Sequence, residues 1–139
     1  MGRIAMLIWI LLLLAVIALG YIRLAPSDPA VWHQVPEVHG NLDLPGGVDR
    51  RVVVGPDGLA RLDRIIRATP RTRVLAGTVP EGMVTYITRS MVFGFPDYTT
   101  VHQAGDALQI HARLRFGRSD FGVNRARVDQ WLETLNQAG

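Results

Sequence analysis

The N-terminal residues form a continuous apolar stretch that sets them apart from the rest of the chain. No residue from Ile4 to Ile22 is charged, and Arg3 and Arg23 flank the stretch. A helix rises about 1.5 Å per residue, so this stretch is roughly 28 Å long as a helix and matches a hydrocarbon core of about 30 Å. Residues 1–23 are therefore predicted to be a transmembrane anchor, with Ile4 to Ile22 in contact with the membrane.

A cleaved signal peptide is the alternative interpretation of this stretch. The small residues Ala18 and Gly20 have the spacing of a cleavage site after Gly20. The apolar run is longer than the usual signal-peptide core of about 7 to 15 residues, and Trp9 and Tyr21 suit the two membrane interfaces. An uncleaved, single-pass anchor is the favoured interpretation.

The charges on the two flanks of the apolar stretch predict its orientation. Arg3 and the amino terminus are more positive than the other flank, where Arg23 is followed by Asp28. Positively charged flanks stay in the cytoplasm, so the rest of the chain is placed outside it. We therefore expect a protein of the inner (cytoplasmic) membrane whose C-terminal domain is periplasmic.

Residues 24–50 have no sustained apolar period and are rich in proline and glycine. Such a composition predicts a linker, or an extended segment that lies on the folded domain. Trp32, within "SDPAVWH", is expected to dock on the domain or on the bilayer interface.

Residues 51–139 have the pattern of a single α+β domain. Short β-branched or alternating runs predict strands, and two stretches with apolar residues at helical spacing predict helices. The predicted elements are a strand at 50–55, a helix at 57–68, strands at 71–78, 82–91, 98–103 and 107–116, and a helix at 122–137. Consecutive strands with one apolar face need a cover, so we expect a curved antiparallel sheet packed on two helices. This order, β-α-β-β-β-β-α, is similar to TATA-binding-protein-like and helix-grip domains.

The last two strands also predict how they pair. "LQIHARLRF" alternates apolar and polar residues throughout, and "QAGDAL" predicts a two-residue type II′ turn at 105–106. In this register Val101 lies opposite Ile110 on the core face. The other face is expected to be wet, with these pairs: His102 and Gln109, Thr100 and His111, and Tyr98 and Arg113 as a cation-π pair.

Charge and composition narrow the classes of partner. The net charge is +3, and all 15 basic residues are arginine. Arg61, Arg64, Arg67, Arg71 and Arg73 give the N-terminal third of the domain a basic side. Because the excess charge is small and the domain is tethered, anionic headgroups are a better partner than nucleic acid, which we do not expect to bind. Without cysteine the chain has neither a disulfide nor a lipoprotein attachment site.

Two motif-rich stretches resemble a known family. "YITRSMVFGFPDYTTV" (86–101) and "ARLRFGRSDFGVNRARVDQWLETL" (112–135) resemble the uncharacterised bacterial and plastid family catalogued as domain of unknown function 1499. "RLAPSDPAVWH" (23–33) resembles the segment after the membrane anchor in proteobacterial members. The resemblance implies the fold and the location, and it supplies no reaction. Its signature residues here are Arg89, Ser90, Phe95, Pro96, Asp97, Arg118, Ser119, Asp120, Gly122, Asn124 and Arg127.

These signature residues support two interpretations of the "GFPD" and "GRSD" turns. In the favoured one, Arg127 or Arg89 bridges to Asp97 or Asp120 and clamps the two turns together, since a planar guanidinium can hold two carboxylates. In the other, Arg118 and the start of the last helix hold an anion. The candidate residues for either role are Arg89, Ser90, Asp97, Arg118, Ser119, Asp120, Asn124 and Arg127.

Catalytic and metal chemistry have weaker support in the sequence. Ser90 and Ser119 lack a nucleophile-elbow pattern and have no histidine nearby in the chain. His102 and His111 without a close carboxylate make a poor metal site, so we expect no catalytic residue, metal or cofactor. The main hypothesis is a non-enzymatic, membrane-anchored envelope domain that binds a partner protein or a lipid-like ligand. The alternative is an envelope-lipid hydrolase or transferase acting through the GRSD and GFPD loops.

Overall fold

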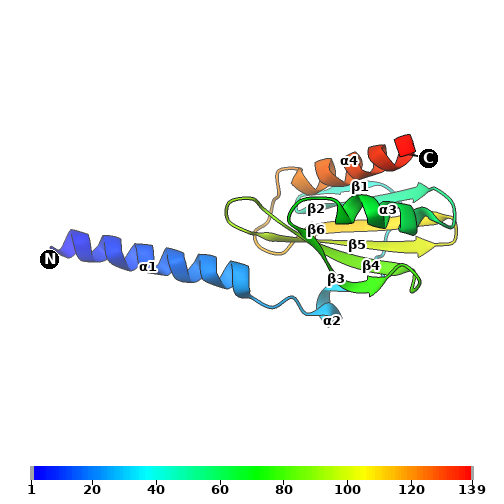
Figure 1. Cartoon of the computed structure of the whole chain (residues 1–139). Coiled ribbons are helices and arrows are strands. Elements are labelled where there is room, and N and C mark those ends of the chain that lie inside the picture. Colours follow the sequence, from blue (N-terminus) through cyan, green and yellow to red (C-terminus); the bar gives the residue numbers. More distant parts are fainter. Residues whose placement is uncertain (1, 139) are drawn as a thin grey trace.

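The computed structural model describes residues 2–138, and its N-terminal helix projects from one end of a folded domain (Figure 1). This helix, α1 (Arg3–Leu24), is long and apolar enough to cross a membrane. None of its residues is buried by the domain, as expected for a helix whose apolar surface needs another apolar environment.

Six antiparallel strands form one open sheet. In chain order they are β1 (Leu42–Leu44), β2 (Gly47–Val53), β3 (Thr72–Thr78), β4 (Met83–Arg89), β5 (Pro96–Ala104) and β6 (Ala107–Leu114). Their order across the sheet is β1-β2-β6-β5-β4-β3. The predicted α+β class and the order from β2 to the last helix are confirmed. The sheet begins at Leu42, however, within the segment that composition alone predicts to be a linker.

Two helices cover one face of the sheet, as predicted. They are α3 (Gly58–Arg67) and α4 (Val123–Ala138), which lie together over the strands in Figure 1. Leu62 and Ile66 of α3, with Trp131 of α4, pack against strand residues in a single hydrophobic core. A helix-grip domain can hold a ligand under its last helix. Here Val128, Trp131 and Leu135 fill that space, because each is at most 5 % exposed.

The predicted register of β5 and β6 is confirmed. Val101 pairs with Ile110 and Tyr98 with Arg113, and the strands join through Gly105, whose φ is +62°. Glycine adopts this left-handed backbone without strain, which explains the tight turn. The Arg113 guanidinium carbon lies 6.0 Å from the centre of the Tyr98 ring, so the expected cation-π pair is present.

The expectation that the second face of the sheet is exposed to solvent is wrong. Tyr98 and Thr100 on that face are fully buried, because the segment after α1 lies across them. This segment contains a short helix that the sequence did not predict, α2 (Pro29–Trp32), and its Trp32 ring stacks on Tyr98 with centroids 4.0 Å apart. Trp32 therefore docks on the domain, one of the two outcomes expected for it.

Arg113 is the charged group most affected by this cover. Its guanidinium carbon lies 5.5 Å from the centre of the Trp32 ring and 6.0 Å from that of Tyr98, and its Nη1 donates to Thr100 Oγ1 at 2.8 Å. Burial lowers the pKa of Arg113 to about 10, which still leaves it charged at neutral pH. The polar residues of β6 are thus satisfied by the chain itself instead of by solvent.

Candidate functional site

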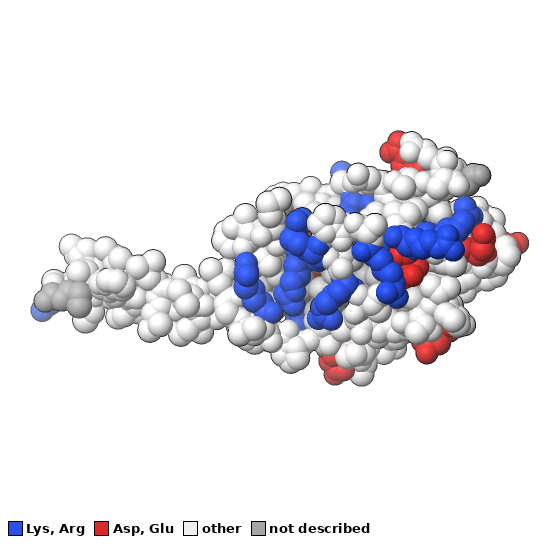
Figure 2. Space-filling model, viewed as in Figure 1, with Lys and Arg blue, Asp and Glu red and all other residues white. Residues whose placement is uncertain are grey.

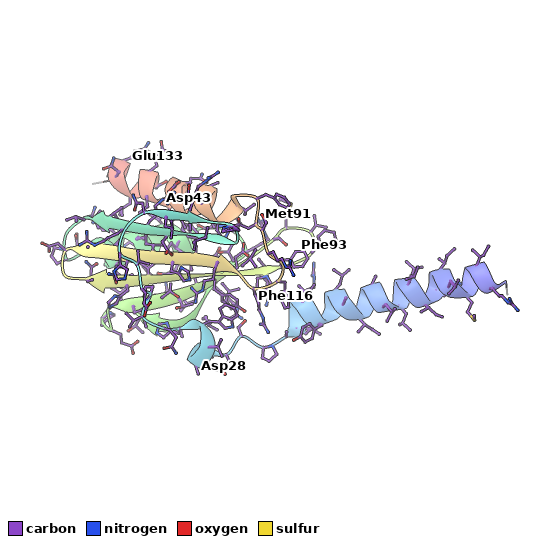
Figure 3. The ribbon with its side chains drawn as sticks, turned by 180° about the vertical axis from the view of Figure 1, so that it is seen from behind. Asp28, Asp43, Met91, Phe93, Phe116 and Glu133 are labelled. Atoms are coloured by element: carbon purple, nitrogen blue, oxygen red, sulfur yellow. The ribbon has the colours of Figure 1, made fainter. Side chains whose placement is uncertain are left out.

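Both signature turns lie at the end of the domain where α1 joins it. The turn 90–95 connects β4 to β5, and the loop 115–122 connects β6 to α4. Since β5 and β6 are antiparallel, the start of one strand and the end of the other share an edge of the sheet. Figure 3 shows Met91, Phe93 and Phe116 at this end, beside the base of α1. We call it the α1 end of the domain.

Four of the eight candidate residues form a hydrogen-bonded cluster at this end. Asp120 Oδ2 accepts from the backbone N–H and the side-chain Nδ2 of Asn124, at 3.0 and 2.8 Å. Asn124 Oδ1 in turn accepts from Arg127 Nη1 at 3.1 Å. Arg127 Nη1 also lies 3.3 Å from Asp97 Oδ2, across the sheet-helix boundary. Asp97, Asp120, Asn124 and Arg127, which we call the acidic cluster, thus connect the two turns.

The acidic cluster is largely closed to solvent. Asn124 is fully buried, and the side chains of Asp97 and Arg127 are 15 % and 17 % exposed. Burial raises the pKa of Asp97 above its usual value of 3.8, while the Arg127 charge pulls it down and the Asp120 charge pushes it up. The cluster has one cation for two carboxylates, and its polar atoms bond to each other. This arrangement holds structure together and leaves little room for an added anion.

The other four candidates lie outside the acidic cluster. Arg118 and Ser119 are exposed, and the Ser119 hydroxyl accepts from the Phe121 N–H at 3.2 Å. The Ser90 hydroxyl accepts from the Phe95 N–H at 2.9 Å. Both hydroxyls are used to shape their own turns, as is common for serine at such positions.

Arg89 does not join either carboxylate. Its Nη1 donates to the backbone carbonyl of Gly94 at 2.9 Å and to that of Ile22 at 3.4 Å. It therefore ties the 90–95 turn to the end of α1. Of the two arginines expected to bridge the turns, only Arg127 makes the ion pair with Asp97.

A second contact joins α1 to the same turn. Arg23, in the last turn of α1, donates to the carbonyls of Val92 and Phe93 at 2.8 and 3.3 Å. Tyr21 also meets Phe116 edge-on, with ring centroids 6.1 Å apart. The position of the domain relative to α1 is thus set by several contacts and not by a free linker.

The α1 end of the domain carries exposed apolar side chains on both loops. Met91 is 75 % exposed and Phe121 is 94 % exposed, and Val92 and Phe93 are exposed as well. Phe121 has a φ of +53°, a left-handed backbone that costs a non-glycine residue about 1–2 kcal/mol. These exposed apolar side chains lie on the two loops next to the end of α1.

A pocket that was not predicted from the sequence lies next to these loops. It has a volume of about 540 Å³, and four of its nine lining residues are Arg23, Arg71, Arg73 and Arg89. The "RTR" run after the first domain helix was a partial indication of this pocket in the sequence, because it places Arg71 and Arg73 close together. The other two come from distant parts of the chain, so no local spacing connects them.

The histidines of β5 and β6 have protein partners. His102 Nδ1 lies 3.1 Å from Gln109 Oε1, and His111 Nδ1 lies 2.5 Å from Asp49 Oδ1. Across residues 2–138, no group of three or more His, Cys, Asp or Glu side chains is placed to hold a metal ion.

Comparison with known proteins identifies a family for this chain and gives no activity for it. The model of the family described as "Protein of unknown function (DUF1499)" matches residues 51–135, which cover β2 through most of α4. No curated protein and no solved structure shows significant similarity to the chain. Because the family match extends over more than half of the chain and includes both signature turns, the chain belongs to the DUF1499 family.

Proposed function

We propose that this chain is a single-pass, membrane-anchored binding domain without enzymatic activity, which rests on the bilayer and takes a lipid-like ligand there. The observation that carries the proposal is the 90–95 turn. Its apolar side chains are exposed at the point where α1 ends, and Arg23 and Arg89 hold the turn against that end.

The geometry supports contact between this turn and the membrane. If α1 spans the bilayer, Arg23 lies near the headgroups, as basic residues flanking a membrane helix do. Met91, Val92 and Phe93 then lie at the same level, where their burial in the interface is favourable by about 25 cal/mol per Å² of apolar surface. Phe121 on the neighbouring loop adds to the same surface.

The proposal includes the location expected from the flanking charges: an inner-membrane protein with the domain in the periplasm. Fusion of alkaline phosphatase or green fluorescent protein to the C-terminus tests it. We expect an active phosphatase and a dark fluorescent protein, since the former needs an oxidising compartment. The opposite pair of results would contradict the orientation.

The contacts of the two serines favour binding over hydrolysis. A catalytic serine needs a free hydroxyl next to a general base. The Ser90 and Ser119 hydroxyls instead accept backbone N–H groups in their own turns. A lipid-like ligand is favoured over a partner protein because the neighbouring pocket combines arginines with apolar lining residues, Ile87 and Met91.

A spin-label experiment tests the membrane contact. The chain has no cysteine, so Met91→Cys and Glu81→Cys each provide one labelling site in the full chain, reconstituted in liposomes. Glu81 is exposed in the turn before β4, about 20 Å of strand away from the α1 end of the domain. We expect the label at 91 to be relaxed by oxygen and protected from a water-soluble nickel complex, and the label at 81 to show the reverse. Equal access of the nickel complex to both labels would refute the proposal.

A further inference from the structure

The arginine pocket at the α1 end of the domain has the features of an anion site. It lies on the second face of the sheet, between the end of α1 and strands β3 and β4. Figure 2, which has α3 and the β3 edge in front as in Figure 1, shows basic side chains gathered along the domain from the point where the N-terminal helix joins it. No aspartate or glutamate lines the pocket, and its four arginines are Arg23, Arg71, Arg73 and Arg89.

The four pocket arginines have no carboxylate partner among the described residues. Elsewhere on the domain Arg50, Arg61, Arg67, Arg125 and Arg127 each form an ion pair with an aspartate. Arg51, Arg64, Arg113, Arg115 and Arg118 also lack an ion pair among the described residues, so what distinguishes the four pocket arginines is that they surround a single hollow without a carboxylate in its lining. Their mutual repulsion is relieved by an anion placed between them.

Their donors are only partly used. Arg23 and Arg89 donate to backbone carbonyls, and Arg71 Nε donates to the Arg89 carbonyl at 3.1 Å. Arg73 is exposed on β3, and no hydrogen bond from its side chain occurs in the part of the chain that the structure describes. Each guanidinium has five N–H donors, so most of them remain free to bind a ligand.

The backbone of Arg71 provides an independent observation. Its φ is +56°, the left-handed region that non-glycine residues rarely occupy. Strain of this kind costs about 1–3 kcal/mol and persists at ligand sites, where it positions a side chain. At Arg71 the strained backbone is also fixed by its carbonyl, which accepts from the Arg89 N–H at 2.9 Å.

We propose that this pocket binds a phosphate-bearing anion, presented at the level where α1 leaves the membrane. A phosphate has enough oxygens to take more than one guanidinium, and arginine binds it bidentately. Ile87 and Met91 then contact the apolar part of the ligand. The inference that the phosphate belongs to a lipid rests on the proposed function. The inference that the pocket binds phosphate does not.

The test uses the full chain in dodecyl maltoside micelles, which contain no phosphate, with isothermal titration calorimetry in HEPES buffer. One arm titrates inorganic phosphate, and the other titrates dioctanoyl phosphatidic acid. Tighter binding of the lipid assigns the site to a lipid headgroup, and equal binding assigns it to a soluble phosphate. Both results support the pocket, and binding of neither ligand overturns it.

Two variants with the same change in charge decide whether the pocket itself is responsible. Arg73→Gln removes a pocket donor on β3, and Arg51→Gln removes an exposed arginine on β2, four strands away from β3 in the sheet. We expect Arg73→Gln to weaken binding at least about tenfold and Arg51→Gln less than about twofold. Equal weakening by the two variants would show only nonspecific attraction to the basic domain and would overturn the proposal. A failure here leaves the spin-label result at Met91 unchanged, so the two proposals can fail separately.

Discussion

Arg127 and Arg73 lie at the same end of the domain but in opposite surroundings. Arg127 is mostly buried on the helix-covered face and pairs with Asp97, while its neighbour Asn124 links it to Asp120. Arg73 is exposed on the other face, beside three more arginines and no carboxylate. Arginine therefore serves two purposes in this domain, and the groups around each arginine show which purpose it serves.

The comparison also divides the family signature into two parts. Asp97, Asp120, Asn124 and Arg127 bond to each other, so substitutions among them should act on folding. Arg89 of the same signature instead faces the pocket and the end of α1. Residues that belong to the same family signature therefore have different roles in this domain.

The largest effect is expected from Arg127→Ala. The substitution leaves the Asp97 carboxylate largely buried without its ion-pair partner, and the free energy of unfolding should fall by about 2–3 kcal/mol. Urea denaturation of the full chain in micelles, followed by tryptophan fluorescence, measures it. Arg125→Ala is the matched control, because Arg125 and Asp43 are both about half exposed, and it should change stability by less than about 0.5 kcal/mol. Equal losses in the two variants would contradict the structural role of Arg127.

Asn124→Ala should have the next largest effect. Asn124 is fully buried, donates to Asp120 Oδ2 and accepts from Arg127. Removing its amide leaves those groups with fewer partners, at a cost of about 1–3 kcal/mol in the same unfolding assay. Phosphate binding by the folded variant should be unchanged. A variant that keeps its stability but loses phosphate binding would place the ligand in the acidic cluster instead of the pocket.

Arg73→Gln should show the opposite behaviour. The Arg73 side chain is exposed, so the free energy of unfolding should stay within about 0.5 kcal/mol of the starting protein while phosphate binding falls. The unfolding curves and the titrations are compared on the same samples. A clear loss of stability would mean that Arg73 has a structural partner like that of Arg127.

The smallest effect concerns the titration of Asp97. Its pKa is raised above 3.8 by burial, so the folded chain holds this proton more tightly than the unfolded chain. Its contribution to stability therefore grows as the pH falls through that pKa and is lost as the pH rises. Carboxyl ¹³C NMR should show Asp97 titrating above 3.8, and Arg127→Ala should raise the value further because the guanidinium lowers it. Asp43, whose pKa Arg50 lowers, is the internal reference, and titration of Asp97 together with it would contradict the assigned burial.

The sequence predicted most of the sheet because the signals there are local. Strict alternation in β6 and a two-residue turn with glycine determine the pairing with β5, residue by residue. β1 was missed since three residues, "LDL", are too short to show a period. The second face was expected to be wet because its residues are polar, although Trp32 and its neighbours cover them.

The candidate site was predicted only where its residues lie close together in the chain. Asp120, Asn124 and Arg127 follow one another within two helical turns, so their contact could be inferred from spacing. The pocket arginines are Arg23 of α1, Arg71 and Arg73 at the start of β3, and Arg89 of β4. Nothing in the order of the chain brings those three segments together before the fold is known.

The most direct test of this contrast is an NMR titration of the arginine side chains. The chain has 15 basic residues, all arginine, so Nε–Hε spectra of the ¹⁵N-labelled protein in micelles report on every one of them. On addition of phosphatidic acid we predict saturable shifts at Arg23, Arg71, Arg73 and Arg89, and unchanged signals at Arg127 and Arg50. Chemical-shift changes that follow solvent exposure alone would contradict a specific site in the pocket. So would changes at Arg127 without changes at the pocket arginines.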